Sequence, residues 1–122
     1  MSDVDPMAGS ALPMTMEEYE ELAARTLNLS LTRDQRLLDA AAGLAEEAGE
    51  LLGLVRKHQF MGHSIDVARV TIELGDALWC LTTAAGALGV SLEQVAAANI
   101  AKLRKRYPEG YTDARSVERD VE

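Results

Sequence analysis

The sequence is poor in the residues that fill β-sandwiches. Among its 122 residues there are one Phe, one Trp and three Tyr, and only three Pro. Ala and Leu must therefore fill the interior, and such side chains suit close helix packing better than a β-sandwich. No segment shows the apolar–polar alternation of a strand. We expect one all-α domain, since this length supports a single modest core.

Cysteine and long hydrophobic runs are also scarce. Cys80 is the only cysteine, so no intrachain disulfide can form, and we expect a reducing compartment. Residues 1–14 lack the basic start and apolar run of a signal peptide. The longest apolar stretches are too short to span a bilayer. We therefore expect a cytoplasmic protein that is not inserted in a membrane.

Basic residues are outnumbered by acidic ones, and the formal net charge is -8. This balance argues against general binding to nucleic acid or to an anionic membrane surface, because both require a basic surface. An acidic protein can still bind a phosphate ligand if a divalent cation lies between them.

Capping-box patterns indicate where helices begin. Counting from these and from the glycines that end helices, we predict four helices at about residues 15–27, 32–58, 64–88 and 91–106. The two central helices are long, so the predicted architecture resembles a four-helix bundle. Residues 1–14 are predicted to form a loose tail, 15–112 the domain, and 113–122 a polar tail that is irregular or weakly helical.

Four acidic residues occupy unusual positions on the two long helices. At about 100° per residue, Glu47 and Glu73 each fall inside the apolar stripe of their helix. Glu50 and Asp76 lie about 60° to the same side, on the rim of each stripe. Two successive helices thus share one arrangement, a carboxylate in the core stripe and a second on its edge.

Clustered carboxylates in a core are costly unless they are paired or bind a metal. Basic partners on the same faces are few, namely Arg69 and Lys57, and cannot neutralise four acids. A Glu-x-x-Glu pair alone is usually a solvated helix face. It is the repeated placement in a core stripe that favours a metal site. All-oxygen ligands favour a hard cation, Mg²⁺ first and Mn²⁺ as a substitute.

Other metal chemistries fit less well. Di-iron bundles use Glu-x-x-His motifs, whereas here Val55 and Phe60 stand three positions before His58 and His63. Zinc is disfavoured by the single cysteine and by the lack of a paired-histidine motif. Magnesium-dependent phosphate chemistry remains.

Residues 44–51 (Leu-Ala-Glu-Glu-Ala-Gly-Glu-Leu) and 73–79 (Glu-Leu-Gly-Asp-Ala-Leu-Trp) resemble the Glu-x-x-Glu and Glu-x-x-Asp signature of MazG-like nucleoside triphosphate pyrophosphohydrolases. Residues 16–26 and 91–108 resemble the first and last helices of small members, so the resemblance covers about 15–112. It implies the all-α MazG fold and Mg²⁺-dependent hydrolysis of an NTP or dNTP to the monophosphate and pyrophosphate, as house-cleaning of non-canonical or excess nucleotides. The alternative is a non-catalytic, metal-binding helical module with a regulatory or interaction role.

The resemblance also implies roles for individual residues. The family's metal-binding positions fall on Glu47, Glu50, Glu73 and Asp76. Glu46 stands where a Gly or Ala is expected in the closest relatives, and it is a further ligand, a water-activating base or a solvated residue. The catalytic base is expected to be Glu47 or Glu46.

The family's phosphate-facing positions fall on Asn99, Lys102 and Arg106, which share one helix face because they are spaced by three and four. Basic residues at a helix C-terminus also interact favourably with the helix dipole without any ligand. Lys57 has a similar but weaker case. Trp79 lies off the core stripe and either stacks on the base or, the favoured reading, packs against a partner subunit. Family members are dimers or tetramers, so we expect a homodimer or homotetramer.

Overall fold

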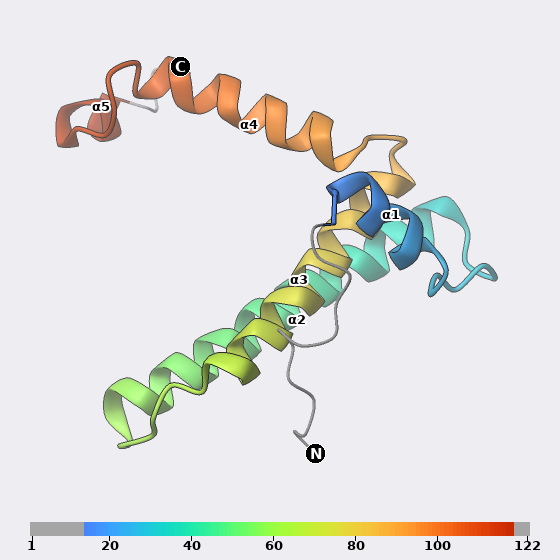
Figure 1. Ribbon diagram of the computed structural model, residues 1–122, viewed down its shortest axis with the longest axis horizontal. Coiled ribbons are helices and arrows are strands. Elements are labelled where there is room, and N and C mark those ends of the chain that lie inside the picture. The colour runs from blue at the N-terminus through green and yellow to red at the C-terminus, as the bar shows by residue number, and fades with distance from the viewer. Residues whose placement is uncertain (1–13, 119–122) are drawn as a thin grey trace.

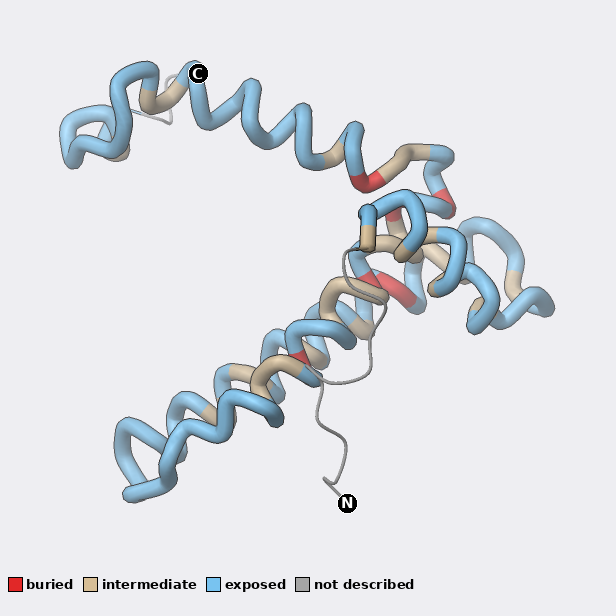
Figure 2. The backbone as a smooth tube through the Cα atoms, viewed as in Figure 1, coloured by how far each residue is buried: buried red, intermediate tan, exposed pale blue. Residues whose placement is uncertain are grey.

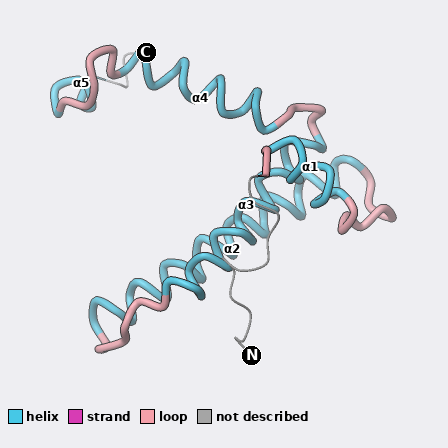
Figure 3. The backbone as a smooth tube through the Cα atoms, in the orientation of Figure 1, coloured by secondary structure: helices cyan, strands magenta, loops and turns pink. Residues whose placement is uncertain are grey.

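The computed structural model describes residues 14–118, so most of the predicted N-terminal tail and residues 119–122 lie outside the described residues. The elements in order are α1 (Met16–Ala24), α2 (Arg33–Phe60), α3 (Val67–Ala87), α4 (Leu92–Arg106) and α5 (Asp113–Glu118). Figure 3 shows helices joined by loops, with no strand in this part of the chain. The predicted all-α class with two long central helices is confirmed.

The three predicted capping boxes are all present. Thr15, Thr32 and Ser91 each accept a hydrogen bond from a backbone N–H three residues later, and the Glu or Gln at that position reaches back to the cap. These local bonds satisfy N–H groups that a helix start leaves without partners. The first residues of α1, α2 and α4 therefore follow from local sequence.

Other boundaries differ from the prediction. α1 ends at Ala24, with a turn where three further helical residues were expected, and α2 continues two residues further, to Phe60. α3 begins at Val67, later than the predicted 64 or 65, because the Asp66 carboxylate caps it by accepting from the Arg69 N–H at 3.2 Å. The predicted polar tail contains the short helix α5.

α2 and α3 pack side by side as a long antiparallel hairpin (Figure 1). The two helices approach closely at Gly43 of α2, because a Cβ placed there would lie 2.9 Å from Cys80 Sγ of α3. Cys80 is buried, as is Ala40 one turn before Gly43. Cys80 thus packs in the interface between the two helices.

α1 lies at one end of this hairpin and is tied to both α3 and α4. Trp79 Nε1 on α3 donates to Thr26 Oγ1 just after α1, at 2.7 Å. Glu20 Oε1 on α1 accepts from the Leu92 N–H at the start of α4, at 3.1 Å. Beyond this point α4 diverges from the hairpin (Figure 1), so within one chain the bundle is open on that side.

Few side chains are buried in this open arrangement, as Figure 2 shows. Large apolar side chains remain exposed on all the major helices, among them Leu38 at 71%, Leu52 at 67% and Leu74 at 52%. Contiguous exposed apolar surface usually marks an interaction site in a folded protein. Within residues 14–118, no helix combines the length and hydrophobicity needed to cross a bilayer.

The contact between Gly43 and Cys80 gives the first prediction. Gly43→Ala should lower the free energy of unfolding by about 1–3 kcal/mol, because the added methyl meets the buried sulfur. In a Cys80→Ala background the same substitution should instead stabilise by up to about 1 kcal/mol, because alanine favours the helix and the obstructing atom is gone. Urea denaturation of the four proteins measures both values.

Gly49→Ala, with no atom near its added Cβ, is the control and should not destabilise. Equal effects of Gly43→Ala in both backgrounds would contradict the packing argument.

Candidate divalent-cation site

Three carboxylates meet between the two long helices. Glu47 comes from α2, and Glu73 and Asp76 come from α3; one oxygen of each lies within 4.8 Å of the others. Glu73 is buried at 6% exposure, Glu47 is half-buried and Asp76 is exposed. The group is therefore anchored in the helix interface and open to solvent on the Asp76 side.

The polar atoms of this group are only partly satisfied. Arg69 lies one turn before Glu73, and its Nε contacts Glu73 Oε1 at 3.3 Å. Glu47 Oε2 and Glu73 Oε2 are buried without a hydrogen-bond partner. Buried oxygens without partners are rare because losing hydration is costly. An all-oxygen donor set with two such atoms fits a hard divalent cation, which would satisfy both.

Mutual repulsion and hydrogen bonding shift the pKa values of these acids in opposite directions. The pKa of Glu47 is raised to about 7, first by its hydrogen bond with Glu73, then by burial and by the neighbouring charges. The pKa of Glu73 is lowered, chiefly by its interaction with the neighbouring carboxyl groups of Glu47 and then Glu50. Glu47 therefore retains a proton to higher pH than Glu73 does, and a bound cation must displace that proton.

The other two acids lie close to the group but outside it. The pKa of Glu50 is raised, first by a hydrogen bond with Glu73, so its side chain reaches Glu73 from the exposed side. Glu46 is also exposed. Of the four predicted ligands, the structure brings three within mutual reach and places Glu50 against one of them.

The predicted phosphate-binding residues are more distant. Asn99 and Lys102 are exposed on α4, whose course away from the hairpin keeps this helix from the carboxylates of the same chain (Figure 1). Lys57 lies ten positions beyond Glu47 on α2, about 15 Å along the helix. There it lines a cavity of about 50 Å³ together with His63.

Two aromatic residues, Trp79 and Tyr19, have surroundings that the sequence did not predict. Trp79 is half-buried and donates a hydrogen bond to Thr26 within its own chain, a contact not among the two roles considered for it. Tyr19 of α1 was not among the predicted site residues. Its pKa is raised first by burial and next by the charge of Asp76, so it lies within electrostatic reach of that carboxylate. The sequence carries no signal for this position, because it depends on how α1 crosses the hairpin.

The proton on Glu47 makes cation binding depend on pH. Below about pH 7 a cation must displace that proton, so its affinity should rise by about tenfold per pH unit and level off above pH 7. Calorimetric Mg²⁺ titrations from pH 5.5 to 8 measure this slope and the proton released. Glu47→Gln should remove the pH dependence, whereas Glu46→Gln, outside the group, should keep it. If the affinity for Mg²⁺ stays the same across this pH range, the proton assigned to Glu47 is contradicted.

Comparison with known proteins agrees with this geometry. The sequence model of the MazG nucleotide pyrophosphohydrolase domain matches residues 35–111, which is more than half of the chain and includes Glu46, Glu47, Glu50, Glu73 and Asp76. No significant match was found among curated proteins or among solved structures. The matched stretch runs from the start of α2 to just beyond α4, and its all-α fold agrees with the two long helices that carry the carboxylates. The chain therefore belongs to the MazG nucleotide pyrophosphohydrolase domain family.

Proposed function

We propose that this chain is a Mg²⁺-dependent nucleoside triphosphate pyrophosphohydrolase, with Mn²⁺ as a possible substitute. It would convert an NTP or dNTP into the monophosphate and pyrophosphate, removing non-canonical or excess nucleotides. The observation that carries the proposal is the pair of buried, unpartnered oxygens of Glu47 and Glu73 inside a group of three acids. A protein that used these acids only for folding would leave both oxygens unsatisfied.

The chain's own residues would divide the work as follows. Glu47, Glu73 and Asp76 hold the cation, with Glu50 alongside, and Arg69 keeps Glu73 oriented by its 3.3 Å contact. When bound, the cation supplies neutralisation of phosphate charge and a lower pKa for water. Water attacks the α-phosphorus, the bond to the bridging oxygen breaks, and pyrophosphate leaves. Glu46 or Glu47 accepts the proton of that water.

The remaining phosphate charge calls for basic groups that one chain does not bring to the carboxylates. Asn99, Lys102 and Arg106 share a face of α4. The helix itself runs away from the hairpin of its own chain (Figure 1). We propose that a second copy supplies them, in a homodimer or a dimer of dimers. The exposed apolar side chains support this, because Leu52 and Leu74 on the hairpin and Ile100 on α4 would be covered by a partner.

Activity tests the assignment of the carboxylates. Asp76→Asn and Glu50→Gln should lower Mg²⁺-dependent pyrophosphate release by about 100-fold or more, because charge stabilisation of the reacting phosphates is lost. Glu21→Gln, in one of the two Glu-x-x-Glu pairs of α1 (Glu18 with Glu21), is the matched control and should retain activity. Turnover is measured on a panel of canonical and modified NTPs and dNTPs. Absence of turnover throughout, while Mg²⁺ still raises the melting temperature, would favour the non-catalytic metal-binding module.

Subunit mixing tests the second copy. Asp76→Asn and Lys102→Ala should each be nearly inactive alone, yet mixing them after mild unfolding and refolding should restore activity. A mixed dimer then contains one site with intact carboxylates and an intact partner α4, so recovery should approach about one quarter of the wild-type value. Asp76→Asn mixed with Glu50→Gln is the control and should recover nothing. Failure of the first pair would place Lys102 either in its own chain's site or outside any site.

A further inference from the structure

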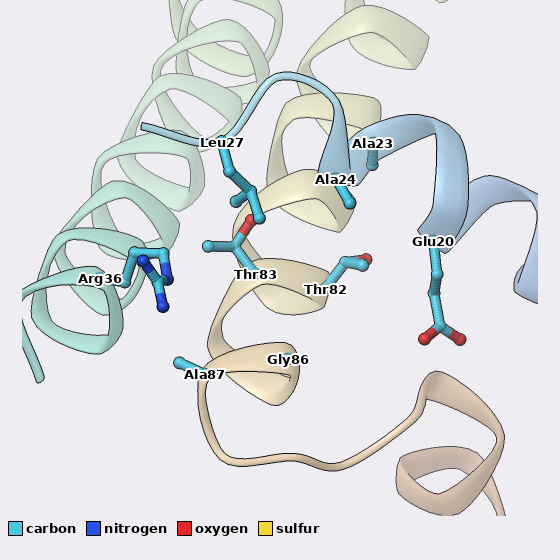
Figure 4. Close-up of a pocket in the computed structure, with 9 residues that line it drawn as sticks. All are labelled: Glu20, Ala23, Ala24, Leu27, Arg36, Thr82, Thr83, Gly86 and Ala87. Atoms are coloured by element: carbon cyan, nitrogen blue, oxygen red, sulfur yellow. The ribbon is translucent and has the colours of Figure 1, made fainter. Parts of the chain in front are cut away.

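A cavity of about 250 Å³ lies near the carboxylates, between α1, α2 and α3 (Figure 4). Much of its wall consists of small residues, so a flat group can lie close to the helix backbones. Two charged side chains lie on opposite sides of it, Glu20 from α1 and Arg36 from α2. The other lining residues are Ala23, Ala24, Leu27, Thr82, Thr83, Gly86 and Ala87.

The cavity lies in line with the cation site. Thr83 in its wall is seven positions after Asp76 on α3, which places it on the same helix face about 10 Å further along. α1 also lies along this part of α3, because the two helices are in contact and Glu20, Ala23 and Ala24 of α1 line the cavity. In a nucleotide, the sugar separates the α-phosphate from the base by a comparable span.

The size of the cavity limits what it can hold. Sites for whole drug-sized ligands occupy about 300–1,000 Å³, so this space admits only one end of a nucleoside triphosphate. The triphosphate end requires cations and basic groups, and the wall offers a single arginine. The end that fits is therefore the base, a flat ring lying between small side chains such as Ala24 and Ala87.

The two charged groups are held in place and have opposite hydrogen-bonding capacities. Arg36 Nη1 donates to the Leu31 carbonyl at 3.0 Å, and its other N–H groups can only donate. Glu20 Oε1 accepts from the Leu92 N–H at 3.1 Å, which leaves its second oxygen as an acceptor. A ring seated between them requires a donor at one edge and an acceptor at the other.

We propose that this cavity binds the base of the substrate nucleotide and selects bases that carry an exocyclic amino group. Cytosine, adenine and guanine offer such a donor to Glu20 and ring acceptors to Arg36. Uracil and hypoxanthine present a carbonyl oxygen where cytosine and adenine present the amino group, and that oxygen faces the carboxylate unfavourably. This inference rests on the proposed function.

The test uses free nucleosides without metal, so it does not depend on turnover. Trp79, the only tryptophan, is bonded to Thr26 next to Leu27 of the cavity wall, and its fluorescence reports occupancy. Cytidine should bind about tenfold more tightly than uridine, and adenosine about tenfold more tightly than inosine. Gly86→Leu, which fills the cavity, should abolish binding of all four.

Glu20→Gln is the decisive variant. Its amide oxygen still accepts from Leu92, so α4 stays in place, while its amide N–H₂ turns the acceptor facing the base into a donor. The preference for the amino bases should shrink to about parity or reverse. Glu21→Gln, the neighbouring exposed carboxylate, is the control and should keep the tenfold preference.

The outcomes separate this inference from the proposed function. Equal binding of the amino and oxo nucleosides, or a preference unchanged by Glu20→Gln, would overturn the inference. Pyrophosphate release with no discrimination between CTP and UTP would overturn it as well and leave the proposed function standing. Nucleoside selectivity without any pyrophosphate release would support the cavity and count against the proposed hydrolysis.

Discussion

The close packing of α2 against α3 is the constraint on which the rest of this structure depends. Where Gly43 meets Cys80, the two helices approach until a methyl group no longer fits between them. That spacing brings Glu47 within reach of Glu73 and Asp76 a turn or so further along. At such distances the pKa of Glu47 rises to about 7 and two oxygens are buried without hydrogen-bond partners, so helix packing itself favours a bound cation.

The local parts of the fold could be predicted from the sequence, because they depend on neighbouring residues. The capping boxes at Thr15, Thr32 and Ser91 are confirmed, and Glu73 is buried as its place in the apolar stripe required. The cap of α3 at Asp66 was not predicted, although an aspartate directly before the first residue of a helix is a recognisable N-cap signal.

The remaining features depend on contacts between distant parts of the chain. The bond from Leu92 to Glu20 joins residues 72 positions apart and fixes the start of α4, and no periodicity reveals it. The cavity between Glu20 and Arg36 and the effect of the Asp76 charge on the pKa of Tyr19 likewise arise from how α1 crosses the hairpin. The predicted phosphate face of α4 is a sound helix-surface pattern, but the sequence does not say which chain's carboxylates it would meet.

The hairpin also has a register. In an antiparallel pair, positions opposite each other have residue numbers with a constant sum, and Gly43 with Cys80, Glu47 with Asp76, and Glu50 with Glu73 all add to 123. One residue inserted into α2 between Gly43 and Glu47 would turn the acids by about 100° away from their partners. The loop between Phe60 and Val67 lies beyond all three pairs, so its length can change without shifting any of them. Insertions and deletions in the loop between α2 and α3 therefore leave the site intact, whereas those within the paired part of the helices disrupt it.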